Sequence, residues 1–311
     1  MSEYAVHPLT RVFLVQNEHR RISMNYKMFY DSLNSKVLDE HQLKMLNFPM
    51  QGEERGRAIL HNLPHPHCPT VPGENLRKCS FCQTVYQVND EDLQPIGTVC
   101  MYHDVKSSNF LTGKHACCGQ FLKSSGCQKR GFHVTEDIDP NNLINFVNSE
   151  VDGLEARKIV YTLDCEFVFT KKGQELASIV MIDQNEREVL NIKVMPESPI
   201  LDYVTKLSGL SASDFVTGGV MKHSMYVKKL RSLVGPNVIL VGHGLKEDLL
   251  RMGLIHNKVV DTSVLYPHRI SSKTNSLTQL WNAHFTGQRI GGSNKALIDC
   301  KKTLRLAKKA L

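Results

Sequence analysis

Long hydrophobic runs and repeated or low-complexity tracts are both missing from this sequence of 311 residues. No apolar stretch approaches the about 18 residues that a membrane-spanning helix needs, so we expect no membrane contact. Near the N-terminus the one apolar patch, Val12–Val15, is too short for the core of a signal peptide. Without an export signal, the nine cysteines are expected to bind metal or lie buried, not to form disulfides.

The composition is that of a globular protein, and its basic charge is uneven. Hydrophobic residues make up 41% and charged residues 22%, which excludes disorder of the whole chain. From Lys158 onward there are 22 lysines and arginines against 13 acidic residues, whereas the preceding part has 16 against 18. Such an excess of positive charge attracts a polyanion, nucleic acid first among them. The alternative is a solvated surface with surplus lysine.

Changes in composition divide the chain into four parts. A proline-rich stretch ending near Pro72-Gly73 marks a boundary, and cysteine and histidine then gather until His133. We therefore predict a helical N-terminal segment (1–70), a Cys/His-rich module (71–134), an acidic linker (135–157) and a C-terminal domain (158–311).

The C-terminal domain alternates between strand-like and helix-like segments. Three adjacent strands followed by alternating helices and strands predict an α/β domain, with a mixed sheet flanked by helices. The expected strands are Ile159–Phe169, Leu176–Asp183, Val189–Val194, Val238–Val241 and Val259–Val260. The expected helices are Ser211–Phe215, His223–Leu233, Leu245–Met252, Leu277–Ala283 and Lys295–Ala310.

Four acidic residues of this domain stand out. Asp164 and Glu166 are two residues apart on a strand, so their carboxylates project from the same face and repel unless a cation lies between them. Mg²⁺ or Mn²⁺ suits such oxygen ligands, whereas the alternative is an edge-strand pair facing water. Asp248 and Asp299 lie on later helices. Four carboxylates could hold two metal ions about 3.5–4 Å apart, an arrangement suited to attack at phosphorus.

Several motifs of this domain form a recognisable set. They are Asp164-Cys165-Glu166, Glu175-Leu176, Thr205–Ser211, Gly242-His243-Gly244-Leu245 and Val260–Arg269. Together they resemble the Rex-type RNA exonucleases of the DEDD (DnaQ-like) superfamily. The resemblance implies an RNase H-like fold, metal-dependent 3′–5′ hydrolysis of single-stranded RNA, and a nuclear location.

By this resemblance the four acids hold two divalent ions, Mg²⁺ or Mn²⁺. One ion activates a water molecule and the other stabilises the leaving 3′ oxygen. Terminal bases stack on apolar side chains, for which Phe167 and Leu210 are candidates. Core packing is the alternative for Phe167.

One position departs from the family pattern. Where the His-containing branch has its general base, five residues before Asp299, this chain has Asn294, and the tyrosine of the other branch is replaced by Lys295. An amide cannot take a proton from water at neutral pH, and losing a general base costs about 10²–10⁴ in rate. The alternative function is therefore a degenerate nuclease that binds RNA or acts as a scaffold. A DNA exonuclease would share the same chemistry.

Cysteines and histidines between residues 79 and 133 have the spacing of zinc ligands. Zinc takes four such ligands, so two structural zinc ions are expected, although the sequence does not tell which ligands share an ion. The order of these residues resembles the CHORD-like zinc modules, and a protein partner or RNA is expected to bind there. The candidate ligands are Cys79, Cys82, Cys100, His103, Cys117, Cys118, Cys127 and His133.

Overall fold

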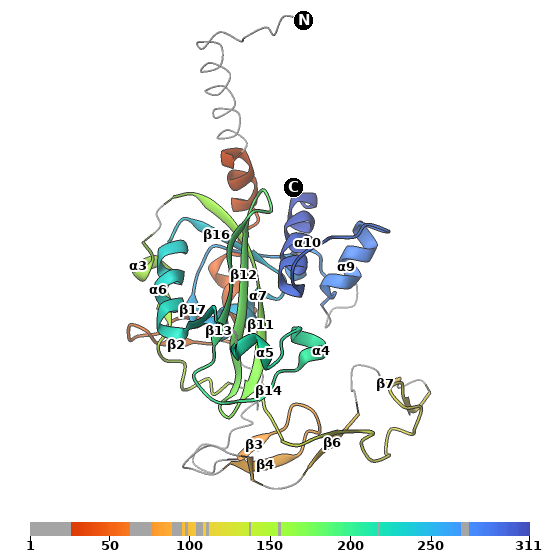
Figure 1. Cartoon of the computed structure of the whole chain (residues 1–311). Coiled ribbons are helices and arrows are strands. Elements are labelled where there is room, and N and C mark those ends of the chain that lie inside the picture. The colour runs from red at the N-terminus through yellow and green to blue at the C-terminus, as the bar shows by residue number, and fades with distance from the viewer. Residues whose placement is uncertain are drawn as a thin grey trace, which may run out of the picture.

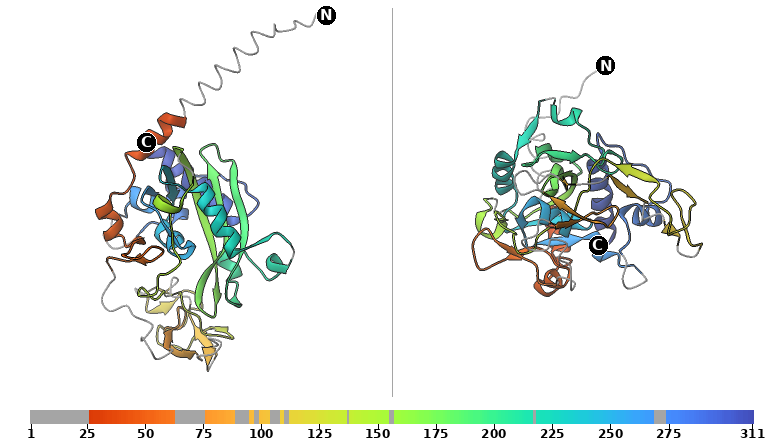
Figure 2. Two further views of the ribbon diagram at one scale, coloured as in Figure 1. Left: turned by 90° about the vertical axis from the view of Figure 1, so that its left-hand side faces the viewer. Right: turned by 90° about the horizontal axis from the view of Figure 1, so that it is seen from below.

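The computed structural model shows a mixed α/β fold with a central sheet and helices on both of its faces (Figures 1 and 2). The predicted fold class is thereby confirmed. The structure describes residues 26–62, 76–88, 95–96, 99–103, 108–109, 112–136, 138–154, 157–216, 218–268 and 274–311. No helix in these ranges is long and apolar enough to cross a membrane.

The central sheet is built around one long strand, β11. β12 pairs antiparallel with β11, and β13 pairs antiparallel with β12, so the three strands form a meander. β16 and β18 run parallel to β11 on its other side. The order is β15-β13-β12-β11-β16-β18, with β14 pairing with the end of β11. The strands are β11 (Ile159–Thr170), β12 (Gly173–Asp183), β13 (Glu188–Met195), β14 (Ile200–Asp202), β15 (Val220–Lys222), β16 (Val238–Gly242) and β18 (Val259–Asp261).

Helices connect the parallel strands, as parallel pairing requires. Helix α6 (His223–Leu233) precedes β16, and α7 (Leu245–Met252) follows it. Figure 1 shows α6 on one side of the sheet and α10 (Lys295–Lys309) with α9 (Leu277–His284) on the other. The shorter helices of this part are α4 (Thr205–Ser208), α5 (Ser213–Val216) and α8 (Thr262–Leu265).

Alternation along the strands separates two cores. On the α10 side, Ala296, Leu297, Cys300 and Leu304 pack against Val180 and Ile182 of β12. On the other side, the largest core contains residues of β11, α6 and α7, including Leu163, Tyr226 and Leu249. Asp164 and Glu166 are an even number of residues from Val160, which packs with Ala307 of α10, so both acids project toward α10.

The segments before β11 belong to the same folded body. Residues 26–34 form a helix, and its Tyr30 and Leu33 pack against β16 and β18. Leu43 of α2 (Glu40–Met45) lies in the largest core. A hairpin follows, formed by β1 (Met50–Gln51) and β2 (Ala58–Ile59), and β10 (Val147–Asn148) pairs with β17 (Leu254–Ile255) before the short helix α3 (Ser149–Asp152).

These contacts show what the predicted N-terminal segment and linker look like where the structure describes them. The first contains a hairpin as well as helices, and the second packs Leu143 and Phe146 against Ile255. Neither is an extended connector between separate bodies. The predicted limits at residues 70, 134 and 157 stay predictions.

The Cys/His-rich module consists of short antiparallel ladders beyond one end of the sheet, next to β14 (Figure 1). Phe81 of the module contacts Phe169 of β11, with ring centroids 5.6 Å apart. Arg130 forms an ion pair with Asp202 of β14 and stacks on Phe81. Its strands are β3 (Leu76–Lys78), β4 (Val85–Val88), β5 (Pro95–Ile96), β6 (Cys100–Tyr102), β7 (Ser108–Asn109), β8 (Lys114–His115) and β9 (Gln128–Arg130).

Candidate active site

The four predicted acids come from three elements: Asp164 and Glu166 project from β11 toward α10, which carries Asp299, and Asp248 lies on α7. Asp164 and Glu166 lie on β11, just before a register shift that follows Glu166. Asp248 lies in the first turn of α7 and is buried, and the Asp299 side chain on α10 is 17% exposed. The charges of Glu166 and Asp299 raise the pKa of Asp164, and the charge of Asp164 raises the pKa of Asp248. The structure therefore brings all four carboxylates into one electrostatic cluster, which we call the acid cluster.

Burial leaves this cluster with more negative charge than its surroundings compensate. Burial and the charge of Glu166 raise the pKa of Asp164 well above its usual value. Burial, followed by the charge of Asp164, does the same for Asp248. The pKa of Glu166 rises to about 7, again through burial, although Lys295 opposes the change. Carboxylates held in this state accept a hard cation, because the cation supplies the charge that water would otherwise balance.

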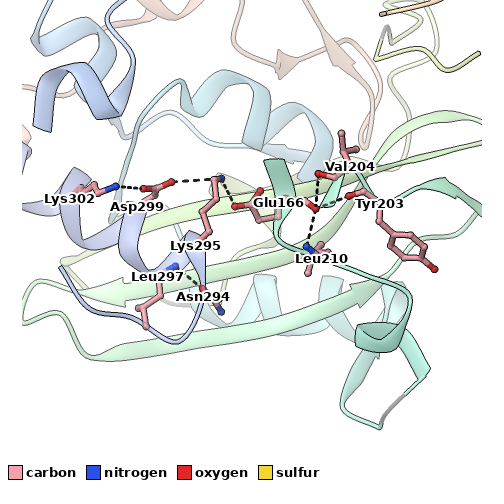
Figure 3. Close-up of polar contacts among 10 residues, drawn as sticks. Glu166, Tyr203, Val204, Leu210, Asn294, Lys295, Leu297, Asp299 and Lys302 are labelled. Atoms are coloured by element: carbon pink, nitrogen blue, oxygen red, sulfur yellow. Dashed lines mark hydrogen bonds and ion pairs between the residues drawn. The ribbon is translucent and has the colours of Figure 1, made fainter. Parts of the chain in front are cut away.

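Two lysines of α10 reach into the cluster, and Figure 3 shows them in one row with Asp299 and Glu166. The Nζ atom of Lys295 lies 2.6 Å from Glu166 Oε1 and 3.7 Å from Asp299 Oδ2. Lys302 Nζ lies 2.9 Å from Asp299 Oδ1. Burial alone would lower the pKa of Lys295, but the neighbouring carboxylates, Glu166 first, raise it. Lys295 is thus a residue of the site, whereas the sequence analysis noted only that it stands in place of a tyrosine.

A signal for Lys295 was present in the sequence. Residues four apart on a helix lie on the same face, so Lys295 and Asp299 had to be neighbours once the helix was placed. Lys302 follows Asp299 by three residues and meets the same condition. The sequence does not show that Glu166 contacts this face of the helix, because that contact depends on how α10 crosses β11.

Asn294 has a structural role at the start of α10. Its Oδ1 accepts a hydrogen bond from the Leu297 N–H at 2.8 Å, which is the N-cap interaction. Its Nδ2 donates to Asn191 Oδ1 at 3.1 Å. Both ends of the amide are therefore engaged, and the group that faces the acids from this turn is the ammonium of Lys295.

Asp261, an aspartate outside the acid cluster, accepts hydrogen bonds from the start of the helix that carries Asp248. It is only 3% exposed and accepts hydrogen bonds from the Gly244 and Leu245 N–H groups at 3.0 and 2.8 Å. It also accepts from the N–H and hydroxyl of Ser263, at 2.8 and 2.7 Å. Asp261 thus satisfies the orphan donors at the starts of α7 and α8. Its role in this structure is to position the turn before Asp248.

His243, which precedes α7, forms a hydrogen bond just after β16 ends. Its Nδ1 lies 3.0 Å from the Thr262 hydroxyl, which itself donates to the Gly242 carbonyl at 3.0 Å. Burial lowers the pKa of His243 and so favours the neutral ring. The histidine is therefore part of the junction between β16 and β18.

A pocket of about 450 Å³ opens beside Glu166. The loop with Leu210 forms one wall, and the N-terminal turn of α10 forms another. Leu210 packs against Val168 and is 6% exposed, so it is both a pocket residue and a core residue. The further lining includes Ser178, Asn191, Lys193, Ser208, Asp214, Asn294 and Lys295.

Phe167 lies elsewhere. It packs against the largest core, on the face of β11 opposite to the acids, with the guanidinium of Arg251 5.6 Å from its ring centroid. This environment is the core packing that the sequence left as the alternative. Phe167 does not line the pocket beside Glu166.

The eight predicted zinc ligands form two groups of four, which answers the question of pairing. In each group the ligand atoms lie within 4.8 Å of one another, and no other such group occurs in the part of the chain that the structure describes. The first group is Cys79, Cys82, Cys100 and His133. The second group is His103, Cys117, Cys118 and Cys127.

The geometry within each group fits a tetrahedral ion. Cys79 and Cys100 have their sulfur atoms 3.7 Å apart, and Cys117 and Cys127 have theirs 3.6 Å apart. Zinc–sulfur bonds of about 2.3 Å at tetrahedral angles would separate two sulfurs by about 3.8 Å. In the second group, His103 Nε2 lies 3.2 Å from the Ser124 carbonyl, a contact that leaves Nδ1 free for a metal. Both groups could hold zinc.

Similar proteins bear on the identity of the chain. No protein-family model matches it. Exonuclease GOR of Pan troglodytes is 32% identical over 85% of this chain and 39% of that protein. The RNA exonuclease 1 homolog of Homo sapiens is 32% identical over 78% of this chain and 20% of that protein. The Neurospora crassa Pan2 catalytic unit is 20% identical over 57% of this chain and 31% of that chain, with a TM-score of 0.45.

The mixed sheet with helices on both faces places the chain among the α/β proteins, and its acid cluster lies beside a pocket. The relatives give the narrower assignment: the chain belongs to the Rex-type RNA exonucleases, as its motifs predicted. It spans well under half the length of these two relatives.

Proposed function

We propose that this chain is a metal-dependent 3′–5′ exoribonuclease that shortens single-stranded RNA. The observation that carries this proposal is the acid cluster beside the pocket: Asp164 interacts electrostatically with Glu166, Asp299 and Asp248, and the four carboxylates come from three elements. Buried carboxylates have no structural need to gather in this way, since their repulsion costs stability. Binding of divalent ions by a hydrolase would explain why these carboxylates lie together.

The oxygen-only donor set of the acid cluster fits Mg²⁺ or Mn²⁺. When bound there, such ions lower the pKa of a bound water and stabilise charge on the phosphate oxygens. The pocket beside Glu166 is the proposed site of the terminal nucleotide, with Leu210 in contact with its base. Lys295 lines the same pocket and supplies positive charge for a phosphate.

A reduced rate is part of the proposal. Both ends of the Asn294 amide are occupied by the helix cap and by Asn191, and the amide is not a base. The proton of the attacking water then leaves without help from this position. We expect a rate about 10²–10⁴ below that of an enzyme with a base there.

For the Cys/His-rich module we propose two structural zinc ions and a role in binding RNA or a protein partner. The support is the pair of four-ligand groups, which leave no ligand position for chemistry. A nuclear location is proposed on the resemblance alone.

The exonuclease proposal is tested with the full chain, Mn²⁺ and a 5′-labelled single-stranded RNA. We expect a ladder of products shortened one nucleotide at a time, and a loss of about 10³ or more in rate for Asp164→Asn. Glu40→Gln, a change on the exposed surface of α2, is the matched control and retains the wild-type rate. Equal, undetectable hydrolysis by all three proteins would contradict the proposal.

A second candidate function, RNA binding without hydrolysis, is favoured by one observation. Lysines occupy the immediate surroundings of Glu166 and Asp299, where a nuclease would present free carboxylates. In the same assay this candidate predicts that the labelled RNA is bound with equal affinity by wild type and Asp164→Asn, and that it remains intact.

A further inference from the structure

The acid cluster is compensated unevenly by the lysines of α10. Glu166 and Asp299 have ammonium partners, Lys295 and Lys302, at 2.6 and 2.9 Å. Neither Asp164 nor Asp248 forms an ion pair with any lysine or arginine of the described ranges. The close ammonium partners therefore lie at Glu166 and Asp299. The charges of Lys295 and Lys302 also act on Asp164, and that of Arg251 acts on Asp248, but none of these cations forms an ion pair with either carboxylate.

The two lysines are fixed in place by the helix that carries Asp299. Lys295 precedes Asp299 by one turn and Lys302 follows it by one turn, so both are neighbours of Asp299 on the surface of α10. The Lys302 side chain is 19% exposed and the Lys295 side chain 50% exposed. Figure 3 shows that Lys295 bridges α10 and β11, because its ammonium group lies between Asp299 and Glu166.

Charge balance follows from these positions. Four carboxylates face two ammonium groups, so the cluster lacks the charge of one divalent ion and not that of two. Because Glu166 and Asp299 have ion-pair partners, the two carboxylates of the cluster without one are Asp164 and Asp248. A second divalent ion between Glu166 and Asp299 would have to share that space with the Lys295 ammonium, which repels it.

We infer that this chain takes one divalent ion, at Asp164 and Asp248, and that the Lys295 ammonium serves as the second cation beside Glu166 and Asp299. The inference rests on the proposed function, because it takes the acid cluster to be an ion site. It replaces the two-ion arrangement that the family resemblance implied with one ion and one side chain.

The number of bound ions tests the inference directly. Titration of Mn²⁺ into the zinc-loaded full chain, followed by the electron paramagnetic resonance signal of free Mn²⁺, is expected to show one site in the wild type. Lys295→Met removes the charge and keeps the length of the side chain, so it is expected to add a second Mn²⁺ site. Lys295→Arg keeps the charge and is expected to retain one site.

Lys301→Met is the matched control. Lys301 belongs to the same helix, but its Nζ donates to the Gly291 carbonyl at 3.1 Å and has no contact with the acid cluster. This variant is expected to bind one Mn²⁺, as the wild type does. Two sites in the wild type, or a single site in Lys295→Met, would overturn the inference while leaving the proposed function intact. No Mn²⁺ site in any variant would overturn both.

A measurement on the unaltered chain covers the case in which Lys295→Met does not fold. The amine reactivity of each lysine is measured by pulse labelling and mass spectrometry, with and without saturating Mn²⁺. Because Lys295 stays beside Glu166 in the proposed arrangement, its labelling relative to Lys301 is expected to remain unchanged. A rise on addition of Mn²⁺ would show that the ion displaces the ammonium, and the inference would fail.

Discussion

His256 shows how strongly burial can act on one side chain of this protein. It is 1% exposed, its Nε2 donates to the Val238 carbonyl at 2.9 Å, and its Nδ1 lies 2.7 Å from the Ser149 hydroxyl. Burial lowers its pKa to about 4. The neutral ring thus joins the segment before β11 to β16.

A pH-dependent stability follows for His256. The unfolded chain binds the proton near pH 6.5 and the folded chain only near pH 4, so stability falls as pH decreases through this window. The full effect is about 3 kcal/mol in the free energy of unfolding. Urea denaturation at several pH values measures it.

His256→Gln is the comparison for this measurement, because glutamine does not titrate. The difference in unfolding free energy between wild type and variant is expected to shrink as pH decreases from about 6.5 to about 4. A difference that stays constant over this range would contradict the shifted pKa. The raised pKa values of Asp164 and Glu166 act in the opposite direction, but they are common to both proteins and cancel.

Among the elements, α7 depends most clearly on a partner outside itself. It begins after Gly244, whose φ of 72° lies in the left-handed region, and no side chain of its own caps it. The first N–H groups are satisfied by Asp261, which ends β18. The position of Asp248 on α7 therefore depends on the Asp261 carboxylate, which lies at the end of β18.

Asp261→Ala is expected to lower the free energy of unfolding by about 2–4 kcal/mol, because buried donors lose their acceptor. Asp39→Ala is the matched control, since Asp39 caps α2 in an exposed capping box and its loss should cost about 1 kcal/mol. Chemical denaturation of both variants compares the two caps. Equal, small losses would show that Asp261 has no special part in holding α7.

The elements of the sheet domain could be predicted well from the sequence. The helices predicted at His223–Leu233 and Leu245–Met252 have the predicted bounds, and glycines flank the second of them on both sides. The strands β14, β15 and β17 were missed, since each has only two or three residues and pairs through distant partners. A strand of two or three residues is too short to show an alternation of apolar and polar side chains.

The acid cluster was predicted in part for a related reason. Strand alternation places Asp164 beside Glu166, and the motif spacing locates Asp248 and Asp299. The Lys295 contact with Glu166 joins two elements 129 residues apart, so local pattern cannot reveal it. The grouping of zinc ligands was open for the same reason, because chain folding alone decides which ligands meet.

At the scale of the whole molecule, the Cys/His-rich module and the sheet domain are joined by specific contacts. Phe81 lies between Tyr102 of the module and Phe169 of β11, with centroid distances of 5.0 and 5.6 Å. Just after the module, the Glu136 carbonyl accepts a hydrogen bond from Arg251 at 2.7 Å. These contacts place the first zinc-ligand group against the strand that carries Asp164.

Gly126→Ala tests the second zinc-ligand group. A Cβ atom at Gly126 would lie 2.1 Å from the backbone nitrogen of Tyr102, so the turn before Cys127 must move. Zinc content, measured by atomic emission on the purified chain, is expected to fall from two to one per molecule. Gly131→Ala, in the same module, adds its Cβ to open space and is expected to retain two. Unchanged zinc in Gly126→Ala would contradict the assignment of Cys127.

The pairing of β10 with β17 has a practical consequence for anyone who wishes to dissect the molecule. Cutting the chain at residue 158 would strip Val147 from its partner Leu254, uncover Ile255 and Val160, and remove Tyr30, Leu33 and Leu43 from their cores. A fragment that starts there would keep every carboxylate of the acid cluster and yet expose apolar surface that the intact protein hides. Minimal expression fragments should therefore begin no later than residue 26.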